Sequence, residues 1–132
     1  MIIISRDKSK LQVEVIYQFI TNSYWGKGRT KEQVQTTINN SLCFGLYKDT
    51  IQIGFGRIAT DYAIFAYLMD LFVLPEYRGK GYSKQLMEAI INAEELKECK
   101  TWMLKTFDAH DLYKQFGFTE LNNPDIVMER LL

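Results

Sequence analysis

The sequence is poor in the residues that build metal and redox sites. Its two cysteines, Cys43 and Cys99, lie far apart and form no C-x-x-C motif, and His110 is the single histidine. Transition-metal sites in proteins draw mainly on clustered Cys and His ligands, and catalytic cysteines need an activating partner. We therefore expect no metal site and two buried thiols.

An excess of charge of either sign is also missing. Sixteen Lys and Arg residues balance sixteen Asp and Glu residues. Proteins that bind nucleic acid usually present a broad basic surface, so this balance argues against a nucleic-acid partner. Any anion must then be bound by a local group of positive charges.

Long apolar runs and linker segments are lacking as well. The opening M-I-I-I segment meets polar residues from Ser5, so it is too short for a signal peptide or a membrane span. The two prolines, Pro75 and Pro124, lie in no linker-like tract, and no repeat divides the chain. We expect one cytoplasmic domain over residues 1–132 that does not act at a membrane.

The chain does contain clear alternation between strand and helix patterns. Short β-rich runs predict strands at residues 1–5, 43–47, 51–59, 63–74, 101–107 and about 126–130. The strand that ends before Pro75, the helix that follows it and the next strand should form a parallel crossover. The prediction is a mixed α/β fold in which helices flank one sheet.

Four helices are predicted between these strands. Ser9 could cap the first, which should end near Asn22, and Thr30 opens the second because T-K-E-Q is a capping box. The third follows the glycine-containing turn before residue 84. Asp108 could cap a short fourth helix that Gly117 ends.

The turn between the long strand and the third helix is the most informative segment. It reads L-P-E-Y-R-G-K-G-Y-S over residues 74–83. Glycines allow a ligand to approach the main chain, and the free N–H groups at a helix start attract anions. Lys80 and Lys84 at the helix start oppose the helix dipole, which favours a functional reason for them. The alternative is an ordinary strand-to-helix turn with solvated lysines.

Residues 73–83 resemble the coenzyme A signature of the GNAT superfamily of N-acetyltransferases, [Q/R]-x-x-G-x-[G/A]. Arg78, Gly81 and Ser83 occupy its three specified positions, with Ser83 in place of the usual glycine or alanine. Residues 108–118, D-A-H-D-L-Y-K-Q-F-G-F, are similar to the second family signature. The resemblance implies a central, mostly antiparallel sheet with a splayed parallel strand pair and flanking helices.

The same resemblance implies acetyl-CoA as the co-substrate, and its family also makes a homodimer an option. The expected coenzyme A contacts are Phe72, Val73, Arg78, Gly79, Lys80, Gly81, Tyr82, Ser83 and Asp108. A backbone N–H near Phe72 would stabilise the oxyanion that forms during acyl transfer. Family members place acceptor contacts between their first two helices, which implies Tyr24 and Trp25 as contacts with the acceptor; the alternative is a pair of aromatic residues that cover the core.

Two side chains are candidates for catalysis. The resemblance gives Tyr113 the role of the acid that protonates the leaving sulfur; the alternative is a core tyrosine beside Phe116. Asp70 interrupts the apolar run A-Y-L-M-D-L-F-V-L, so it could be a general base or a hydrogen-bonded structural aspartate. Neither role for Asp70 is favoured by the sequence.

The leading hypothesis is an acyltransferase that moves the acetyl group of acetyl-CoA to a primary amine by direct attack in a ternary complex. No Cys or Ser motif suggests an acyl-enzyme. The acceptor could be a small molecule or a peptide. The alternatives are a non-catalytic acyl-CoA-binding sensor or regulatory module, and a phosphate-binding protein of another kind.

Overall fold

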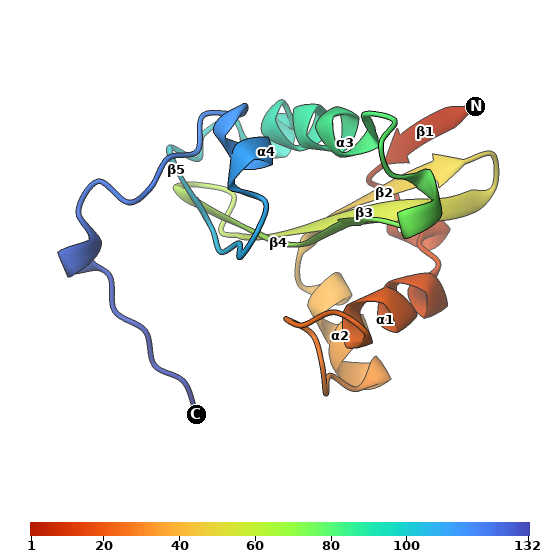
Figure 1. Ribbon diagram of the computed structural model, residues 1–132, viewed down its shortest axis with the longest axis horizontal. Coiled ribbons are helices and arrows are strands. Elements are labelled where there is room, and N and C mark those ends of the chain that lie inside the picture. The colour runs from red at the N-terminus through yellow and green to blue at the C-terminus, as the bar shows by residue number, and fades with distance from the viewer.

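The computed structural model describes residues 1–132 and contains one five-stranded sheet with helices on both faces (Figure 1). The strands are β1 (Ile2–Ser5), β2 (Leu42–Lys48), β3 (Ile51–Thr60), β4 (Phe65–Val73) and β5 (Thr101–Leu104), and they are ordered β1-β2-β3-β4-β5. The first four are antiparallel neighbours, whereas β4 and β5 are parallel. The predicted fold class and the parallel crossover are confirmed.

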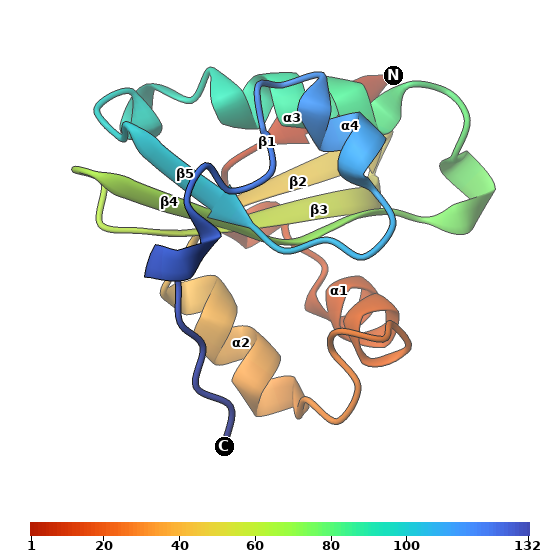
Figure 2. The same cartoon turned by 60° about the vertical axis from the view of Figure 1, so that its left-hand side comes forward.

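The four helices form two layers, one on each face of the sheet. Helices α1 (Val13–Thr21) and α2 (Lys31–Asn39) cover one face, and α3 (Tyr82–Ile91) and α4 (His110–Lys114) lie on the other (Figures 1 and 2). Each layer has its own apolar core, because β2 and β3 bury side chains on both faces. None of these helices combines the length and the apolar character needed to cross a membrane.

The start of α2 follows the sequence prediction. The Thr30 side chain accepts a hydrogen bond from the Gln33 N–H (3.0 Å), and the Gln33 side chain accepts one from the Thr30 N–H (2.8 Å). This capping box is confirmed because all of its partners are local in sequence.

The predicted cap of the first helix at Ser9 is wrong. Asp7 Oδ1 accepts hydrogen bonds from both the N–H and the hydroxyl of Ser9, which holds residues 8–10 in a short 3₁₀ turn. Helix α1 begins at Val13 instead, with Gln12 as its N-cap, and ends before Asn22 as predicted.

The predicted cap of the last helix at Asp108 is also wrong. Ala109 is the N-cap of α4, and the Thr106 hydroxyl accepts its N–H (3.0 Å). The helix therefore begins one residue later than a cap at Asp108 would require, and no side chain makes a capping hydrogen bond. Gly117 follows the helix with φ +89°, the left-handed conformation that suits glycine after a helix.

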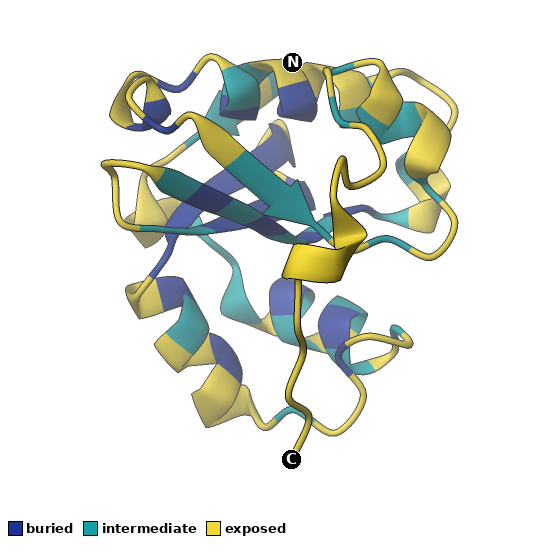
Figure 3. Ribbon diagram, turned by 90° about the vertical axis from the view of Figure 1, so that its left-hand side faces the viewer, coloured by how far each residue is buried: buried dark blue, intermediate teal, exposed yellow.

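The last predicted strand, at residues 126–130, is absent. Residues 124–126 form a single 3₁₀ turn, and no strand follows them. This segment leaves the body of the molecule and is exposed along its whole length (Figure 3). A strand needs a partner, and no neighbouring strand of this chain pairs with these residues.

Candidate active site

The site begins where β4 and β5 part. Their pairing runs only from Phe65 opposite Thr101 to Leu68 opposite Leu104. Beyond Leu68, β4 continues to Val73, while β5 ends at Leu104. The two parallel strands therefore open into a gap at their carboxyl ends, the splayed pair that the family resemblance implied.

A β-bulge in β4 lies beside this gap. Phe72 pairs with Phe55 and Met69 with Arg57, so two residues of β4, Asp70 and Leu71, stand opposite Gly56 alone. Asp70 has φ +55°, which is uncommon for a residue with a side chain. Such a bulge bends the strand and changes the directions of its side chains and amides.

The backbone of Val73 faces the gap. The Leu74 N–H donates to the Ile53 carbonyl of β3 (2.8 Å), so alternation along the strand turns the Val73 polar groups to the opposite side. Arg78 Nε donates to the Val73 carbonyl (3.0 Å) from that side. By the same alternation the Phe72 amide points at β3. The backbone N–H that we expected near Phe72, as the donor to the oxyanion, is therefore better supplied by Val73 or by a residue of the bulge.

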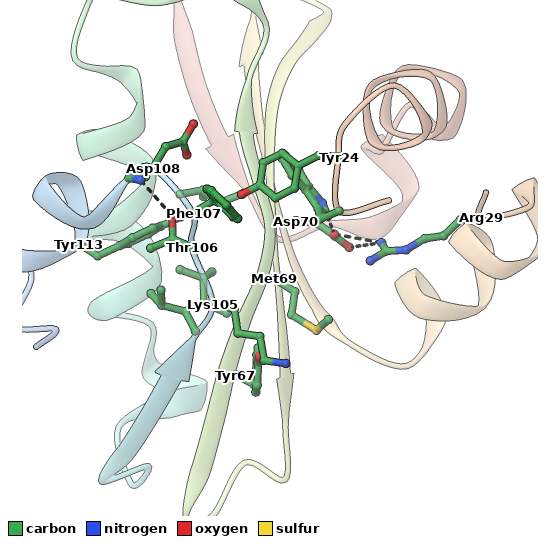
Figure 4. Close-up of a pocket in the computed structure, with 15 residues that line it drawn as sticks. Tyr24, Arg29, Tyr67, Met69, Asp70, Lys105, Thr106, Phe107, Asp108 and Tyr113 are labelled. Atoms are coloured by element: carbon green, nitrogen blue, oxygen red, sulfur yellow. Dashed lines mark hydrogen bonds and ion pairs between the residues drawn. The ribbon is translucent and has the colours of Figure 1, made fainter. Parts of the chain in front are cut away.

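A cavity of about 420 Å³ occupies the parting of the strands (Figure 4). Its walls come from the loop after α1, from β4 around the bulge, from the segment after β5 and from α4. The lining residues are Tyr24, Trp25, Arg29, Tyr67, Leu68, Met69, Asp70, Leu71, Leu104, Lys105, Thr106, Phe107, Asp108, Ala109 and Tyr113. The cavity thus brings together five residues singled out from the sequence: Tyr24, Trp25, Asp70, Asp108 and Tyr113.

Asp70 is the centre of a buried hydrogen-bond network. Its Oδ1 accepts from Trp25 Nε1 (2.8 Å) and from Arg29 Nη1 (3.0 Å). Its Oδ2 accepts from Arg57 Nε (2.9 Å) and again from Arg29 Nη1 (3.1 Å). The Asp70 side chain is 1% exposed. Both oxygens are already engaged, which favours the structural role over that of a base needing a free lone pair.

Sequence reasoning missed both arginines of this network. Arg57 lies in an otherwise apolar strand with its side chain 7% exposed, and its Nη1 also donates to Ser41 Oγ (3.1 Å). The sequence did contain a signal for this ion pair, because opposite charges, Arg57 and Asp70, interrupt two consecutive β-rich runs. Arg29 is more open, with its side chain 24% exposed, and its Nε and Nη2 groups have no partner within the protein. Arg29 therefore brings unpaired donors to the cavity wall.

Tyr113 reaches the cavity from α4 and packs edge-on against Phe118, with ring centroids 6.0 Å apart. Burial, followed by the nearby Tyr24 and Asp108, raises the pKa of Tyr113 to about 12. Its phenol is therefore protonated at neutral pH. No hydrogen bond within the protein engages the hydroxyl.

The turn before α3 has open glycines and backbone amides without partners. Gly79 and Gly81 both have φ +80°, and a Cβ added at either would meet no atom within 4 Å. The first backbone N–H after Arg78 to donate within the protein is that of Gln85, to the Gly81 carbonyl (3.2 Å). The intervening amides are free, so the turn fits a pyrophosphate.

The remaining predicted coenzyme contacts flank this turn. Lys80 is exposed, and Tyr82 and Ser83 are the first two residues of α3. Gly81 is the N-cap, and no side chain makes a capping hydrogen bond.

The cysteines lie outside the cavity. Both are buried, and burial raises the pKa of the Cys43 thiol to about 11. A thiol of this kind is a poor nucleophile at neutral pH. No group of three or more His, Cys, Asp or Glu side chains is arranged to hold a metal ion.

The chain was compared with known proteins. Residues 39–120 match the family described as acetyltransferase (GNAT) domain. A crystal structure of a GNAT-family protein from Xanthomonas campestris pv. campestris is 42% identical, with a TM-score of 0.97 over 100% of this chain and 94% of that chain. The fold and the family resemblance inferred from the sequence are thereby confirmed.

Two curated relatives are more distant. A candidate acetyltransferase of Gibberella zeae is 25% identical over 93% of this chain and 82% of its own length. A Bos taurus protein named thialysine N-epsilon-acetyltransferase is 30% identical over 55% of this chain and 48% of its own length. The match to the family model over more than half of the chain shows that the chain belongs to the GNAT family of acetyltransferases.

Proposed function

We propose that this chain is an N-acetyltransferase that transfers the acetyl group of acetyl-CoA to a primary amine by direct attack in a ternary complex. The observation that carries the proposal is the cavity between β4 and β5, close in the fold to a turn of free amides. The turn suits the pyrophosphate, and the gap suits the extended arm of coenzyme A. The cavity is then the place where the thioester meets the amine.

The residues of the turn and of β4 hold the co-substrate in this proposal. Amides of Gly79 to Ser83 bind the pyrophosphate, and Lys80 adds positive charge. The Val73 amide, which faces the gap, is in position to bind the arm or the thioester oxygen. A backbone donor aimed at the developing oxyanion is typically the largest catalytic term in acyl transfer.

Tyr113 is proposed as the acid. The neutral amine nitrogen attacks the thioester carbonyl carbon, the carbon–sulfur bond breaks, and the sulfur takes a proton from the Tyr113 hydroxyl. The attacking nitrogen then gives up a proton to water, which restores the Tyr113 hydroxyl and leaves a neutral amide and the coenzyme A thiol. The raised pKa keeps the Tyr113 hydroxyl protonated at neutral pH before the reaction begins. Because the leaving thiol has a pKa near 8.5, protonation of its sulfur at neutral pH lowers the free energy by only about 2 kcal/mol.

Deprotonation of the amine costs more free energy than departure of the unprotonated thiolate. An alkylammonium of pKa near 10.4 loses its proton at pH 7 at a cost of roughly 4 to 5 kcal/mol. Asp70 lines the cavity, but its contacts with two arginines and Trp25 support the role of an anchor. We therefore propose that water in the cavity carries the ammonium proton to solvent and that Asp70 fixes Trp25 and Arg29 at the acceptor side.

The acceptor is proposed to contact Tyr24, Trp25 and Arg29. The three come from the segment between α1 and α2, which forms one wall of the cavity (Figure 4). The unpaired Nε and Nη2 groups of Arg29 would suit an acceptor that carries a carboxylate. Since the Bos taurus relative is named for thialysine, amino acids with a side-chain amine belong among the first acceptors to test.

The test is a panel of acceptors read by release of the coenzyme A thiol. The panel should hold thialysine, lysine, polyamines, aminosugars and peptides, each with and without a carboxylate where the chemistry allows. We expect thiol release with at least one primary amine and none with the matching alcohol. Binding of acetyl-CoA with no thiol release for any amine would support the non-catalytic acyl-CoA sensor instead.

A further inference from the structure

Phe107 is an exposed aromatic residue that no step of the proposed reaction uses. It lies in the segment between β5 and α4 and is 84% exposed to solvent. Its side chain also lines the cavity between β4 and β5. A ring this open buries little apolar area, so it contributes little to the stability of the fold. A contact with a ligand is the better reason for a phenylalanine at this position.

The Tyr24 ring meets the Phe107 ring from another wall of the cavity. Tyr24 belongs to the loop after α1 and is 63% exposed. The two ring centroids lie 5.8 Å apart, and the ring planes are inclined by 73° in an edge-to-face arrangement. Figure 4 shows this pair between Tyr113 on one side and Asp70 on the other. We call Tyr24 and Phe107 the aromatic portal, because they join two walls of the cavity at exposed positions.

A row of aromatic contacts connects Tyr24 to the core. The Tyr24 ring packs edge-on against Trp25, with centroids 5.2 Å apart. The Trp25 indole is held by its hydrogen bond to Asp70 (2.8 Å). Trp25 lies 6.1 Å from Phe19, which is stacked on the buried Phe72. One side of the aromatic portal is therefore supported by the apolar core and by the buried carboxylate network.

The chemistry of the aromatic portal favours one kind of acceptor over another. Aromatic ring faces attract alkylammonium ions, and methylene groups gain free energy when they pack against apolar surface. A hydroxyl group in the same place loses hydrogen bonds to water that the rings cannot replace. Ten of the fifteen residues that line the cavity are hydrophobic, so the same preference continues behind the portal. An amine on an unbranched alkyl chain meets these conditions, and an aminosugar does not.

The rings also matter for attracting the amine, because free carboxylates are scarce in the cavity. Asp70 and Asp108 are the only acidic residues in its lining. Both Asp70 oxygens are already engaged by Trp25 and two arginines. Asp108 is exposed, where an ion pair contributes little free energy. The attraction of an incoming ammonium group therefore depends largely on the ring faces of the aromatic portal.

We propose that the aromatic portal selects acceptors whose primary amine is carried on an unbranched alkyl chain, with Phe107 as a specificity-determining residue. This inference rests on the proposed acetyl transfer and narrows its substrate class. The methylene groups of the acceptor pack against the rings of Tyr24 and Phe107, and the amine reaches into the cavity. Each methylene group that leaves water in this way raises kcat/KM by up to about fourfold. A hydroxyl-rich amine has no such gain.

The first experiment measures kcat/KM by release of the coenzyme A thiol, for straight-chain amines from propylamine to hexylamine and for glucosamine. In the parent, kcat/KM should rise with chain length and exceed the value for glucosamine. Phe107→Ala should flatten this rise and lower the ratio of hexylamine to glucosamine about tenfold, with an unchanged melting temperature. A parent that prefers glucosamine, or a ratio that Phe107→Ala leaves unchanged, overturns the proposal while the acetyl-transfer reaction stands.

Three matched variants serve as controls. Tyr24→Ala removes the other ring and should lower the same ratio, whereas Tyr24→Phe keeps the ring and should keep the parental ratio. Ile64→Ala shortens an exposed apolar side chain (68%) between β3 and β4, outside the cavity, and should leave the ratio unchanged. An effect of Ile64→Ala equal to that of Phe107→Ala would show that the aromatic portal has no special role.

A second experiment follows binding without turnover. Hexylamine or glucosamine is titrated into the protein with coenzyme A, and NMR follows the indole N–H signals of the two tryptophans. Trp25 contacts the aromatic portal, whereas Trp102 lies outside the cavity and donates to the Cys99 carbonyl (3.2 Å). Hexylamine should shift the Trp25 signal at a lower concentration than glucosamine does, in the parent but not in Phe107→Ala, and leave Trp102 unmoved.

The two experiments separate this inference from the proposed function. A preference for hexylamine at Trp25 without thiol release from any amine supports the aromatic portal and refutes the acetyl transfer. Thiol release without any preference at Trp25 supports the acetyl transfer and refutes the portal.

Discussion

Replacing Asp70 by asparagine separates the two roles that its position allows. The substitution keeps the shape of the side chain but removes the charge that neutralises Arg57 and Arg29. Asp70 and Arg57 are both buried, with side chains 1% and 7% exposed. Removing one partner of a buried ion pair costs about 3 to 5 kcal/mol, because the other charge is left uncompensated.

For a domain of this size, that loss corresponds to a fall in melting temperature of roughly 10 to 20 °C. The double variant Asp70→Asn/Arg57→Met should regain part of the lost stability, because Arg57→Met removes the guanidinium that Asp70→Asn leaves unpaired. The control is Asp108→Asn, which neutralises an exposed carboxylate of the same cavity and should leave the melting temperature nearly unchanged.

The kinetic part compares a strongly basic and a weakly basic amine from pH 7 to pH 10, at a temperature where both proteins are folded. If Asp70 is an anchor, the ratio of the variant and parent rates is the same for both amines and does not change with pH. If Asp70 is the base, the variant should recover at high pH, where the amine loses its proton unaided. Such recovery, combined with a nearly unchanged melting temperature, would refute the anchor role.

Three further substitutions test other parts of the site and core. Gly81→Val should abolish coenzyme A binding in calorimetry while the protein stays folded, because a β-branched residue resists φ +80° and obstructs the amides. Unchanged affinity would show that this turn does not bind the pyrophosphate. Tyr113→Phe should lower kcat at least tenfold with little change in cofactor affinity, as loss of a transition-state contact does; a loss of stability alone would make Tyr113 a core residue. Tyr47→Phe should preserve or raise the melting temperature, since the buried Tyr47 hydroxyl has no hydrogen-bond partner and burial raises its pKa to about 12; a clear fall would indicate a hidden partner.

Features that depend on neighbours in sequence were predictable. The capping box at Thr30 has all its partners within four residues, and the turn of Gly79 and Gly81 is defined by local backbone angles. The strands of the sheet also followed from their β-rich runs. The predicted cap at Ser9 failed because the Asp7 side chain holds Ser9 in a 3₁₀ turn, and the cap at Asp108 failed because α4 begins one residue later; the sequence alone does not rank such local alternatives.

Features that depend on strand register could not be predicted from the sequence. Asp70 was recognised as a charge inside an apolar run, but its pairing with Arg57 follows from the register of β3 against β4 and from the bulge. Arg29 joins the network from a loop that folds over the sheet. The strand expected at residues 126–130 failed for a related reason, because a strand pattern does not reveal whether an open edge lies within reach of its own chain.

The parting of β4 and β5 also determines how quickly neighbouring amides exchange their hydrogens with solvent. The Leu74 N–H is held by the Ile53 carbonyl, so it exchanges only when this part of the sheet opens. The Val73 N–H, one residue earlier, faces away from β3 toward the gap beyond the end of β5, so we expect it to exchange faster than the Leu74 N–H in the free protein. A ligand in the gap would slow exchange at Val73 and leave Leu74 as it was. Two adjacent amides would then report separately on occupancy of the gap and on the stability of the sheet.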